Sequence, residues 1–269
     1  GDIARLGLLS MSRSGDDLVI TQSTNTITVT DQYDSSAPEY RIEELELNDA
    51  YTFTLIDGNS GGSGDEVVVG TSSGETLTGG AGMDLLFGGG GDDTLEGGAG
   101  ADYMDGGSGG TDTLTYASSS DGVIVTVNNY EGEHGDAEGD WNTNIANLTG
   151  SAYADILSGG GANNVITGNC SATNTWDGTQ TGDIMYGYGG NDPLTGGSGA
   201  DTLDGGNGDD VLDGGAGADD LIGNTGTDTA SYTSSSAGLT VDLGNTANNT
   251  GDAVGDTYSG IEALRGSPH

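Results

Sequence analysis

The sequence predicts an all-β protein, a right-handed parallel β-roll in two arrays, with β spacers and a small N-terminal β domain capping the roll. Three observations lead to this prediction. A nine-residue unit recurs in register, a longer unit of 116 residues recurs over it, and 54 Gly and 43 acidic residues stand beside only 4 Arg, for a net charge of -39 in 269 residues. A chain of this composition is either disordered or held together by cations, and the periodicity favours the second.

Residues 1–60 hold three of the four Arg and consist of short alternating segments separated by polar turns. The predicted strands are 17–21, 26–30, 41–47 and 51–55. We expect this domain to cap the first coil of the roll, because an open roll end exposes unpaired strand edges.

The first array covers residues 61–116. It reads GGSGDEVVV, GTSSGETLT, GGAGMDLLF, GGGGDDTLE and GGAGADYMD, followed by GGSGGTDTLT with one inserted residue. Gly in the early positions allows a tight turn with positive φ, and the last three positions are long enough only for a short strand. Repeated turns and strands form a parallel roll with two repeats per coil, in which the apolar eighth-position side chains stack into a thin core.

The sixth position of the unit is usually a carboxylate. With two repeats per coil, carboxylates eighteen residues apart face each other across turn carbonyls, and such oxygen cages suit Ca²⁺. The predicted pairs are Glu66/Asp84, Glu75/Asp93, Asp84/Asp102, Asp183/Asp201, Asp192/Asp210, Asp201/Asp219 and Asp210/Asp228, with Asp112 and Asp155 as further ligands. Sites that involve Glu66, Glu75 or the uncharged Asn164 should be weaker or empty.

These units resemble the nonapeptide G-G-x-G-x-D-x-U-x of the RTX (haemolysin-type calcium-binding) repeat. The resemblance covers roughly residues 61–116 and 150–232 and implies several bound Ca²⁺ ions and export by type I secretion. The run S-R-S-G-D-D-L-V-I, followed by R-I-E-E-L-E-L-N-D, resembles the small β domain that is often found just before RTX arrays.

A spacer at 117–149 precedes the second array at 150–232, which contains a ten-residue interruption, GNCSATNTWD. Residues 233–269 repeat the spacer at an offset of 116 and begin a further array, so we expect the chain to be a piece of a longer protein. Each spacer opens with an alternating strand, 123–127 or 239–243, and continues with a G-D-A-x-G-D loop. The loop carboxylates, Asp136 with Asp140 and Asp252 with Asp256, predict a further calcium site, with a solvated turn as the alternative.

The composition excludes several classes of function. Nucleic acid and anionic membranes would be repelled, and no apolar run is long enough for membrane insertion. The chain has no Lys for a Walker A loop, only His134 and His269, and one Cys, so it can form neither an H-E-x-x-H zinc site nor an internal disulfide. Two G-x-S-x-G matches, at 58–62 and 106–110, lack the context of a nucleophile elbow, so no enzyme activity is predicted.

The sequence therefore predicts a calcium-binding structural module of a bacterial extracellular protein, such as an adhesin, surface or fibre component. It would be unfolded at low cytosolic Ca²⁺ and would fold outside the cell. Two alternatives stay open: a noncatalytic tail of a secreted protease, lipase or alginate epimerase, and a filament subunit. Its expected partners are calcium ions and either neighbouring repeats of a larger chain or second copies bound end to end.

Overall fold

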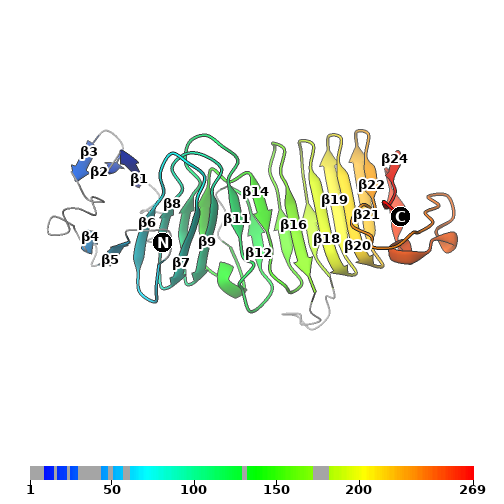
Figure 1. Cartoon of the computed structure of the whole chain (residues 1–269), viewed down its shortest axis with the longest axis horizontal. Helices are drawn as coiled ribbons and strands as arrows, with labels where there is room; N and C mark the ends of the chain where they lie inside the picture. Colours follow the sequence, from blue (N-terminus) through cyan, green and yellow to red (C-terminus); the bar gives the residue numbers. More distant parts are fainter. Residues whose placement is uncertain are drawn as a thin grey trace. The chain divides into compact units, whose positions relative to one another are not determined.

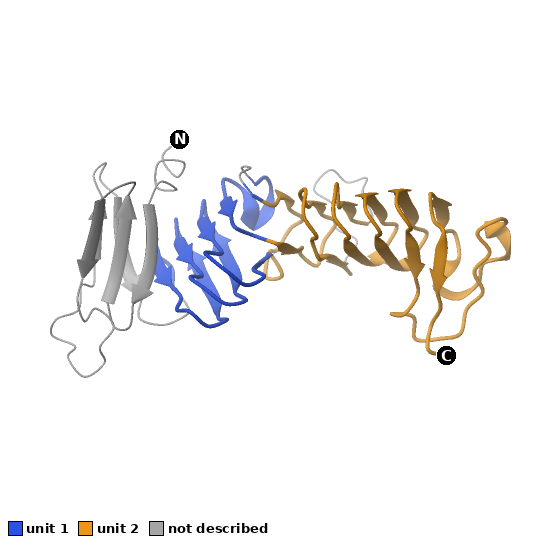
Figure 2. Cartoon of the chain, turned by 90° about the horizontal axis from the view of Figure 1, so that it is seen from above, with its two compact units in different colours: residues 1–115, 128–145 blue, residues 116–127, 146–269 orange. Residues whose placement is uncertain are grey.

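The computed structural model describes residues 61–128, 132–171 and 182–269 in full and, within the first sixty residues, the backbone of five strands. The chain divides into two compact units (Figure 2). Unit 1 comprises Gly1–Thr115 and Asn128–Ile145, and unit 2 comprises Tyr116–Val127 and Ala146–His269. The predicted spacer at 117–149 therefore contributes residues to both units.

Two sheets of short strands form the roll of unit 1 (Figure 1). The first sheet has the order β13-β10-β8-β6-β5-β4, and β11, β9 and β7 are neighbours in the second. The strands are β4 (Glu44–Leu47), β5 (Tyr51–Ile56), β6 (Glu66–Val69), β7 (Thr76–Ala81), β8 (Leu85–Phe87), β9 (Thr94–Ala99), β10 (Tyr103–Asp105), β11 (Thr113–Thr115) and β13 (Trp141–Thr143). All neighbours are parallel except β4 and β5.

The first sixty residues contribute two groups of strands. β1 (Leu9–Ser14), β2 (Asp17–Gln22) and β3 (Asn25–Val29) form an antiparallel sheet. β5 pairs with β6 at the start of the roll, and β4 pairs with β5. A strand therefore forms within or over each predicted segment, and residues 30 and 41–43 of those segments lie outside the described residues. Pairing of β5 with the roll is the arrangement that a cap requires, and the capping role stays a prediction.

Unit 2 contains a parallel six-stranded sheet with the order β12-β15-β17-β19-β21-β23, and in a second parallel sheet β14, β16, β18, β20, β22 and β24 are neighbours in that order. The first consists of β12 (Ile124–Thr126), β15 (Ile156–Ser158), β17 (Ile184–Tyr186), β19 (Thr202–Asn207), β21 (Asp220–Thr225) and β23 (Thr257–Ser259). The second includes β14 (Asn147–Thr149), β16 (Ile166–Cys170), β18 (Pro193–Gly199), β20 (Val211–Gly217), β22 (Thr229–Ser231) and β24 (Ala263–Arg265). Successive strands alternate between the sheets, as expected of a parallel β-roll.

The strand register confirms two repeats per coil. Leu203 pairs with Leu221 and Leu194 with Leu212, at an offset of eighteen residues. The ten-residue interruption raises the offset to 28 where Leu157 pairs with Met185. The coils therefore stay stacked across the interruption, although the register of β16 against β18 shifts between Thr167 and Cys170.

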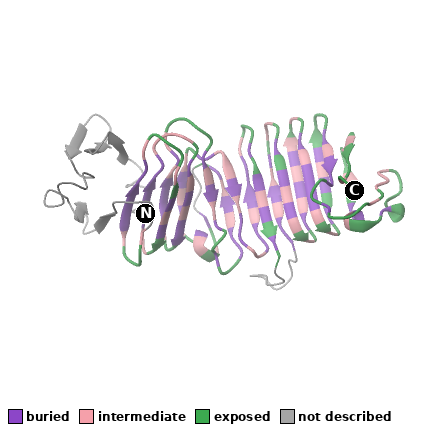
Figure 3. Cartoon of the chain, viewed as in Figure 1, coloured by how far each residue is buried: buried purple, intermediate pink, exposed green. Residues whose placement is uncertain are grey.

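Buried residues lie along the strands of both rolls (Figure 3), and the eighth-position side chains form the core of each. All of them are fully buried: Val68, Leu77, Leu86, Leu95, Met104, Leu114, Leu157, Ile166, Met185, Leu194, Leu203, Leu212 and Leu221. Each coil therefore places two apolar side chains between the two sheets, which is a small core for so acidic a chain.

The two spacers differ at their first strand. β12 forms within the predicted 123–127 and pairs with β15, whereas no strand forms at 239–243, so that prediction is wrong. β12 has β15 as its neighbour, whereas no described strand pairs with residues 239–243. Both G-D-A loops form 3₁₀ turns, at Gly135–Ala137 and Gly251–Ala253. Among the described residues, no helix has the length and apolar character that a membrane span requires.

Candidate metal sites

The turns of successive coils approach one another closely because glycine has no side chain. In unit 1, Gly98 and Gly100 have φ values of 96° and 151°. A Cβ atom on either would overlap the carbonyl oxygen of Gly80 or Gly82 in the preceding coil. The close approach therefore leaves backbone oxygens between the turns, where a cation could reach them.

The sixth-position carboxylates form hydrogen-bonded ladders along each roll. Asp84 Oδ1 accepts the backbone N–H of Glu66 at 2.8 Å, and Asp201 Oδ1 accepts that of Asp183 at 2.7 Å. Four ladders result: Glu66-Asp84-Asp102-Asp140 and Glu75-Asp93-Asp112 in unit 1, and Asp155-Asp183-Asp201-Asp219-Asp256 and Asn164-Asp192-Asp210-Asp228-Glu262 in unit 2. We name each ladder by its first residue.

The ladders bring together every carboxylate pair that the eighteen-residue spacing predicted. They also include one carboxylate from each spacer loop, Asp140 and Asp256, which are fully buried or nearly so. Asp136 and Asp252, the first Asp of each loop, are half-buried. The second Asp of each G-D-A-x-G-D loop therefore occupies the position of a sixth-position carboxylate, and calcium binding at the loops stays a prediction.

Most ladder carboxylates have one oxygen that is buried and has no hydrogen-bond partner. Among the described residues these oxygens are Oε2 of Glu66 and Oδ2 of Asp84, Asp93, Asp102, Asp192, Asp201, Asp210, Asp219 and Asp228. A buried carboxylate oxygen without a donor is costly, about 1–3 kcal/mol or more for a charged group. Such a series of unsatisfied anionic oxygens requires a positive charge beside it.

Each unsatisfied oxygen lies beside a glycine at the first position of its own turn. A Cβ atom placed on Gly205 would lie in contact with Asp210 Oδ2, and one on Gly88 would lie 2.5 Å from both Asp93 Oδ2 and the carbonyl oxygen of Gly106. The space at this position is therefore lined by a carboxylate oxygen and a backbone carbonyl of the next coil. An all-oxygen lining of this kind suits a hard cation such as Ca²⁺.

Burial strongly disfavours ionisation of the ladder carboxylates without a cation. Burial, with the neighbouring carboxylates adding to it, raises the pKa of Asp84 and of Asp183 to about 8. Burial likewise raises the pKa of Asp102 and of Asp219 to about 7. These carboxylates would be partly protonated near neutral pH unless a bound cation compensated their charge.

Four of the described ladder carboxylates have both oxygens satisfied by the protein, three of them with the help of a hydroxyl group. Ser151 and Thr71, at the second position of their turns, donate backbone N–H and hydroxyl groups to Asp155 and Glu75. The Tyr232 hydroxyl donates to Asp256. In addition, Asp183 Oδ2 accepts the backbone N–H of Cys170 at 3.3 Å.

The residues present fit a Ca²⁺ ion that is bound by oxygen ligands from two adjacent coils. No group of three or more His, Cys, Asp or Glu side chains that could hold a metal ion occurs within 61–128, 132–171 and 182–269. The remaining ligands of a six- to eight-coordinate Ca²⁺ would therefore be turn carbonyls, which the glycines leave accessible.

A comparison with protein-family models identifies the RTX calcium-binding nonapeptide repeat in four copies, at residues 78–114, 146–169, 177–212 and 195–230. The chain therefore carries RTX repeats in both arrays, and RTX nonapeptide repeats bind multiple Ca²⁺ ions. No curated protein matches the chain. The match begins at residue 78, the last residue of the Glu75 repeat, and does not include the first sixty residues, whose resemblance to an RTX-associated domain stays a prediction.

Sequence reasoning missed two features of the turns. Glu262 accepts the N–H of Asp228 and ends its ladder. A second ladder follows the fifth position, where the side-chain oxygens of Asn163, Asn191 and Asp209 accept the N–H groups of Asn191, Asp209 and Thr227. The recurrence of Asn or Asp at position five was a visible signal for this cation-independent ladder.

Proposed function

We propose that this chain is a noncatalytic structural module of a bacterial extracellular protein, which folds when Ca²⁺ binds between its coils after export by type I secretion. The observation that carries the proposal is the set of nine buried, unpartnered carboxylate oxygens. Without cations, these charges and a net charge of -39 oppose a small core. When no site exists in the unfolded chain, the free energy of calcium binding contributes directly to folding.

The proposed export mechanism uses the difference in Ca²⁺ concentration across the cell envelope. Inside the cell, low Ca²⁺ leaves the ladder carboxylates without compensation, and the chain stays unfolded and able to pass through a secretion channel. Outside, millimolar Ca²⁺ exceeds an affinity of ~10⁻⁴ M, which is typical of extracellular modules, and the coils form.

A calcium titration of the full chain tests this proposal. We expect circular dichroism to show little β structure in a chelator and a cooperative gain as Ca²⁺ is added, with several ions bound per chain by equilibrium dialysis. Mg²⁺ at the same concentration is the control, because its strict octahedral geometry and strong hydration disfavour such cages. A native-like spectrum in chelator would overturn the proposal.

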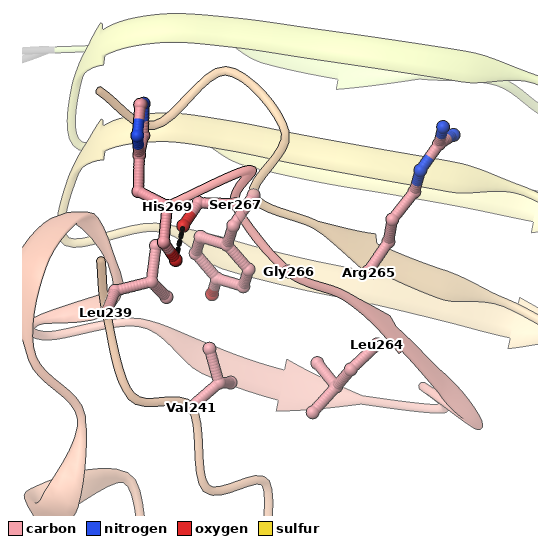
Figure 4. Close-up of a pocket in the computed structure, with 8 residues that line it drawn as sticks. Leu239, Val241, Leu264, Arg265, Gly266, Ser267 and His269 are labelled. Atoms are coloured by element: carbon pink, nitrogen blue, oxygen red, sulfur yellow. Dashed lines mark hydrogen bonds between the residues drawn. The ribbon is translucent and has the colours of Figure 1, made fainter. Parts of the chain in front are cut away.

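A second observation favours a repeating structural or adhesive segment over the tail of an enzyme. At the C-terminal end of unit 2, a cavity of about 300 Å³ is lined by Tyr232, Leu239, Val241, Leu264, Arg265, Gly266, Ser267 and His269 (Figure 4). Shifted by 116 residues, the apolar members of this set become Tyr116, Val123, Val125 and Leu148, which are buried in the same unit. Leu264 is 45% exposed, whereas Leu148 is 0% exposed.

The first spacer indicates what would cover this end. There, β12 pairs with β15 and β14 pairs with β16, so one complete coil covers the apolar residues. At the C-terminal end, residues 240–242 and β24 correspond at an offset of 116 to β12 and β14. We therefore infer that the occupant of this end is a further parallel coil of the same repeat.

An extended chain tests the second inference. Residue 269 aligns with residue 153, so a copy of residues 154–171 is appended after His269, and an appended segment of scrambled sequence is the control. We expect a higher thermal midpoint and slower hydrogen exchange at Ala263–Arg265 for the first chain only. Equal midpoints for the two extended chains would contradict this inference while leaving calcium binding unaffected.

A further inference from the structure

The first carboxylate of the Asp155 ladder is closed by its own turn, which means that a residue of that turn donates hydrogen bonds to both carboxylate oxygens. Asp155 is fully buried, and its Oδ1 accepts the backbone N–H of Val123 and the hydroxyl of Ser151, each at 2.8 Å. Its Oδ2 accepts the backbone N–H of Ser151 at 2.7 Å. Both oxygens therefore have donors without a cation.

The last carboxylate of the same ladder is closed by a different group. Asp256 is 1% exposed, its Oδ1 accepts the N–H of Asp219 at 3.0 Å, and its Oδ2 accepts the hydroxyl of Tyr232 at 2.6 Å. Tyr258 contacts the Tyr232 hydroxyl, and Asn249 donates to Tyr258 at 3.1 Å. This network holds the donor in place inside the roll.

Inside the ladder, Asp183 Oδ2 accepts only the backbone N–H of Cys170 at 3.3 Å, and the next two carboxylates lack such donors. Asp201 Oδ2 and Asp219 Oδ2 are buried and have no partner. The second-position residues of their turns, Gly197 and Gly215, have φ values of 135° and 90°, whereas Ser151 lies outside the positive-φ region. The backbone conformation at position two therefore differs between a closed turn and an open turn, in which one carboxylate oxygen has no donor.

We propose that hydroxyl groups take the place of a cation at both ends of the Asp155 ladder and at Glu75, so that Ca²⁺ binds at the carboxylates whose second oxygen is unpartnered and not at these three. The inference rests on the proposed calcium function. In unit 1, Thr71 closes Glu75 in the same way as Ser151 closes Asp155, with its N–H 2.9 Å from Oε2. The physical reason is that each of these three carboxylates stands first or last in its ladder. It has a second repeat turn on one side only, so half of the oxygen cage is absent, and hydrogen-bond donors satisfy the charge instead.

The number of bound calcium ions tests the proposal. We expect Asp155→Asn and Asp256→Asn to bind as many ions as the unaltered chain in equilibrium dialysis, and Asp201→Asn and Asp219→Asn to lose at least one. Circular dichroism at saturating Ca²⁺ checks that each variant is folded. Loss of an ion in Asp155→Asn or Asp256→Asn would overturn this inference alone, whereas an unaltered chain that binds no calcium would overturn the proposed function.

A second variant adds a site and does not depend on the tolerance of buried Asn. Thr71→Gly, Ser73→Gly and Glu75→Asp together give residues 70–75 the open-turn sequence, opposite the intact turn that ends at Asp93. We expect one additional bound ion. An unchanged number in a folded variant would show that the hydroxyl at position two does not decide whether a carboxylate binds calcium.

Discussion

The rolls of unit 1 and unit 2 have cores of the same kind but differ in their turns. The eighth-position side chains of both are fully buried, so apolar packing does not distinguish them. In unit 1 the first coil carries Glu66, which is partly satisfied by the N–H of Gly64, and Glu75, which is closed by Thr71. In unit 2 the coil of Asp201 and Asp210 has an unpartnered buried oxygen on each side. The comparison teaches that the turn sequence, rather than the core, sets how many cations a coil can hold.

We expect the largest effect from removing Ca²⁺ with a chelator, which should unfold both units. Chelation should abolish the β signal of both units, because neither has a core that offsets uncompensated buried carboxylates. Circular dichroism and near-ultraviolet spectra before and after chelation measure this. A unit 1 that keeps its β structure in chelator would show that its turns are less dependent on Ca²⁺ than those of unit 2.

Protons should replace calcium in part. Burial raises the pKa of Asp84 and Asp183 to about 8 and that of Asp192 and Asp201 to about 6, from 3.8. The cation-free fold therefore binds protons more tightly than the unfolded chain, so its stability is greatest below about pH 4 and is lost as the pH rises through 6 to 8. In chelator, β structure should increase on acidification from pH 8 to pH 4. Light scattering controls for aggregation, and a spectrum that stays unfolded at pH 4 would contradict this expectation.

Within unit 2, Asp201 should matter more than Asp228. Asp201 lies between Asp183 and Asp219 in its ladder, whereas Asp228 lies between Asp210 and the exposed Glu262. Asp201→Ala should raise the Ca²⁺ midpoint of folding more than Asp228→Ala, although each leaves a buried N–H without its acceptor at a cost of about 1–3 kcal/mol. Asp201→Asn separates charge from geometry. Equal midpoints for the two Ala variants would mean that the carboxylates do not pair along the ladder.

Hydrogen exchange at limiting Ca²⁺ should resolve the order of folding. We expect residues 79–105 and 178–231 to be protected first and residues 61–78 later, because the Glu66 and Glu75 repeats offer fewer open carboxylates. Saturating Ca²⁺ is the control, at which all three segments should be protected. Early protection of 61–78 would contradict the assignment of ligands.

The smallest effect should come from a single methylene. Glu66→Asp shortens the side chain to the length found in the interior of the ladder, and we expect a lower Ca²⁺ midpoint for unit 1 with unit 2 unchanged. The matched change Glu96→Asp alters a carboxylate outside the ladders and should leave both midpoints as they are. A shift of equal size in the two variants would point to a general charge effect.

The sequence by itself determined the coil, the core and the carboxylate pairs. Because the nine-residue period is written in the sequence itself, two repeats per coil place Leu203 against Leu221 and Asp201 against Asp219 without reference to any other part of the chain. The offset of 116 residues likewise placed equivalent G-D-A loops in the two spacers, and both form 3₁₀ turns.

The tertiary structure decided which carboxylates are satisfied without a cation and which strands form. Tyr232 meets Asp256 across 24 residues, and Glu262 meets Asp228 across 34, at distances that no short period specifies. Residues 239–243 have the alternation of a strand but no neighbouring strand among the described residues, and they are irregular. A strand and a buried charge both need a partner from elsewhere in the fold, and a local pattern cannot say whether that partner is present.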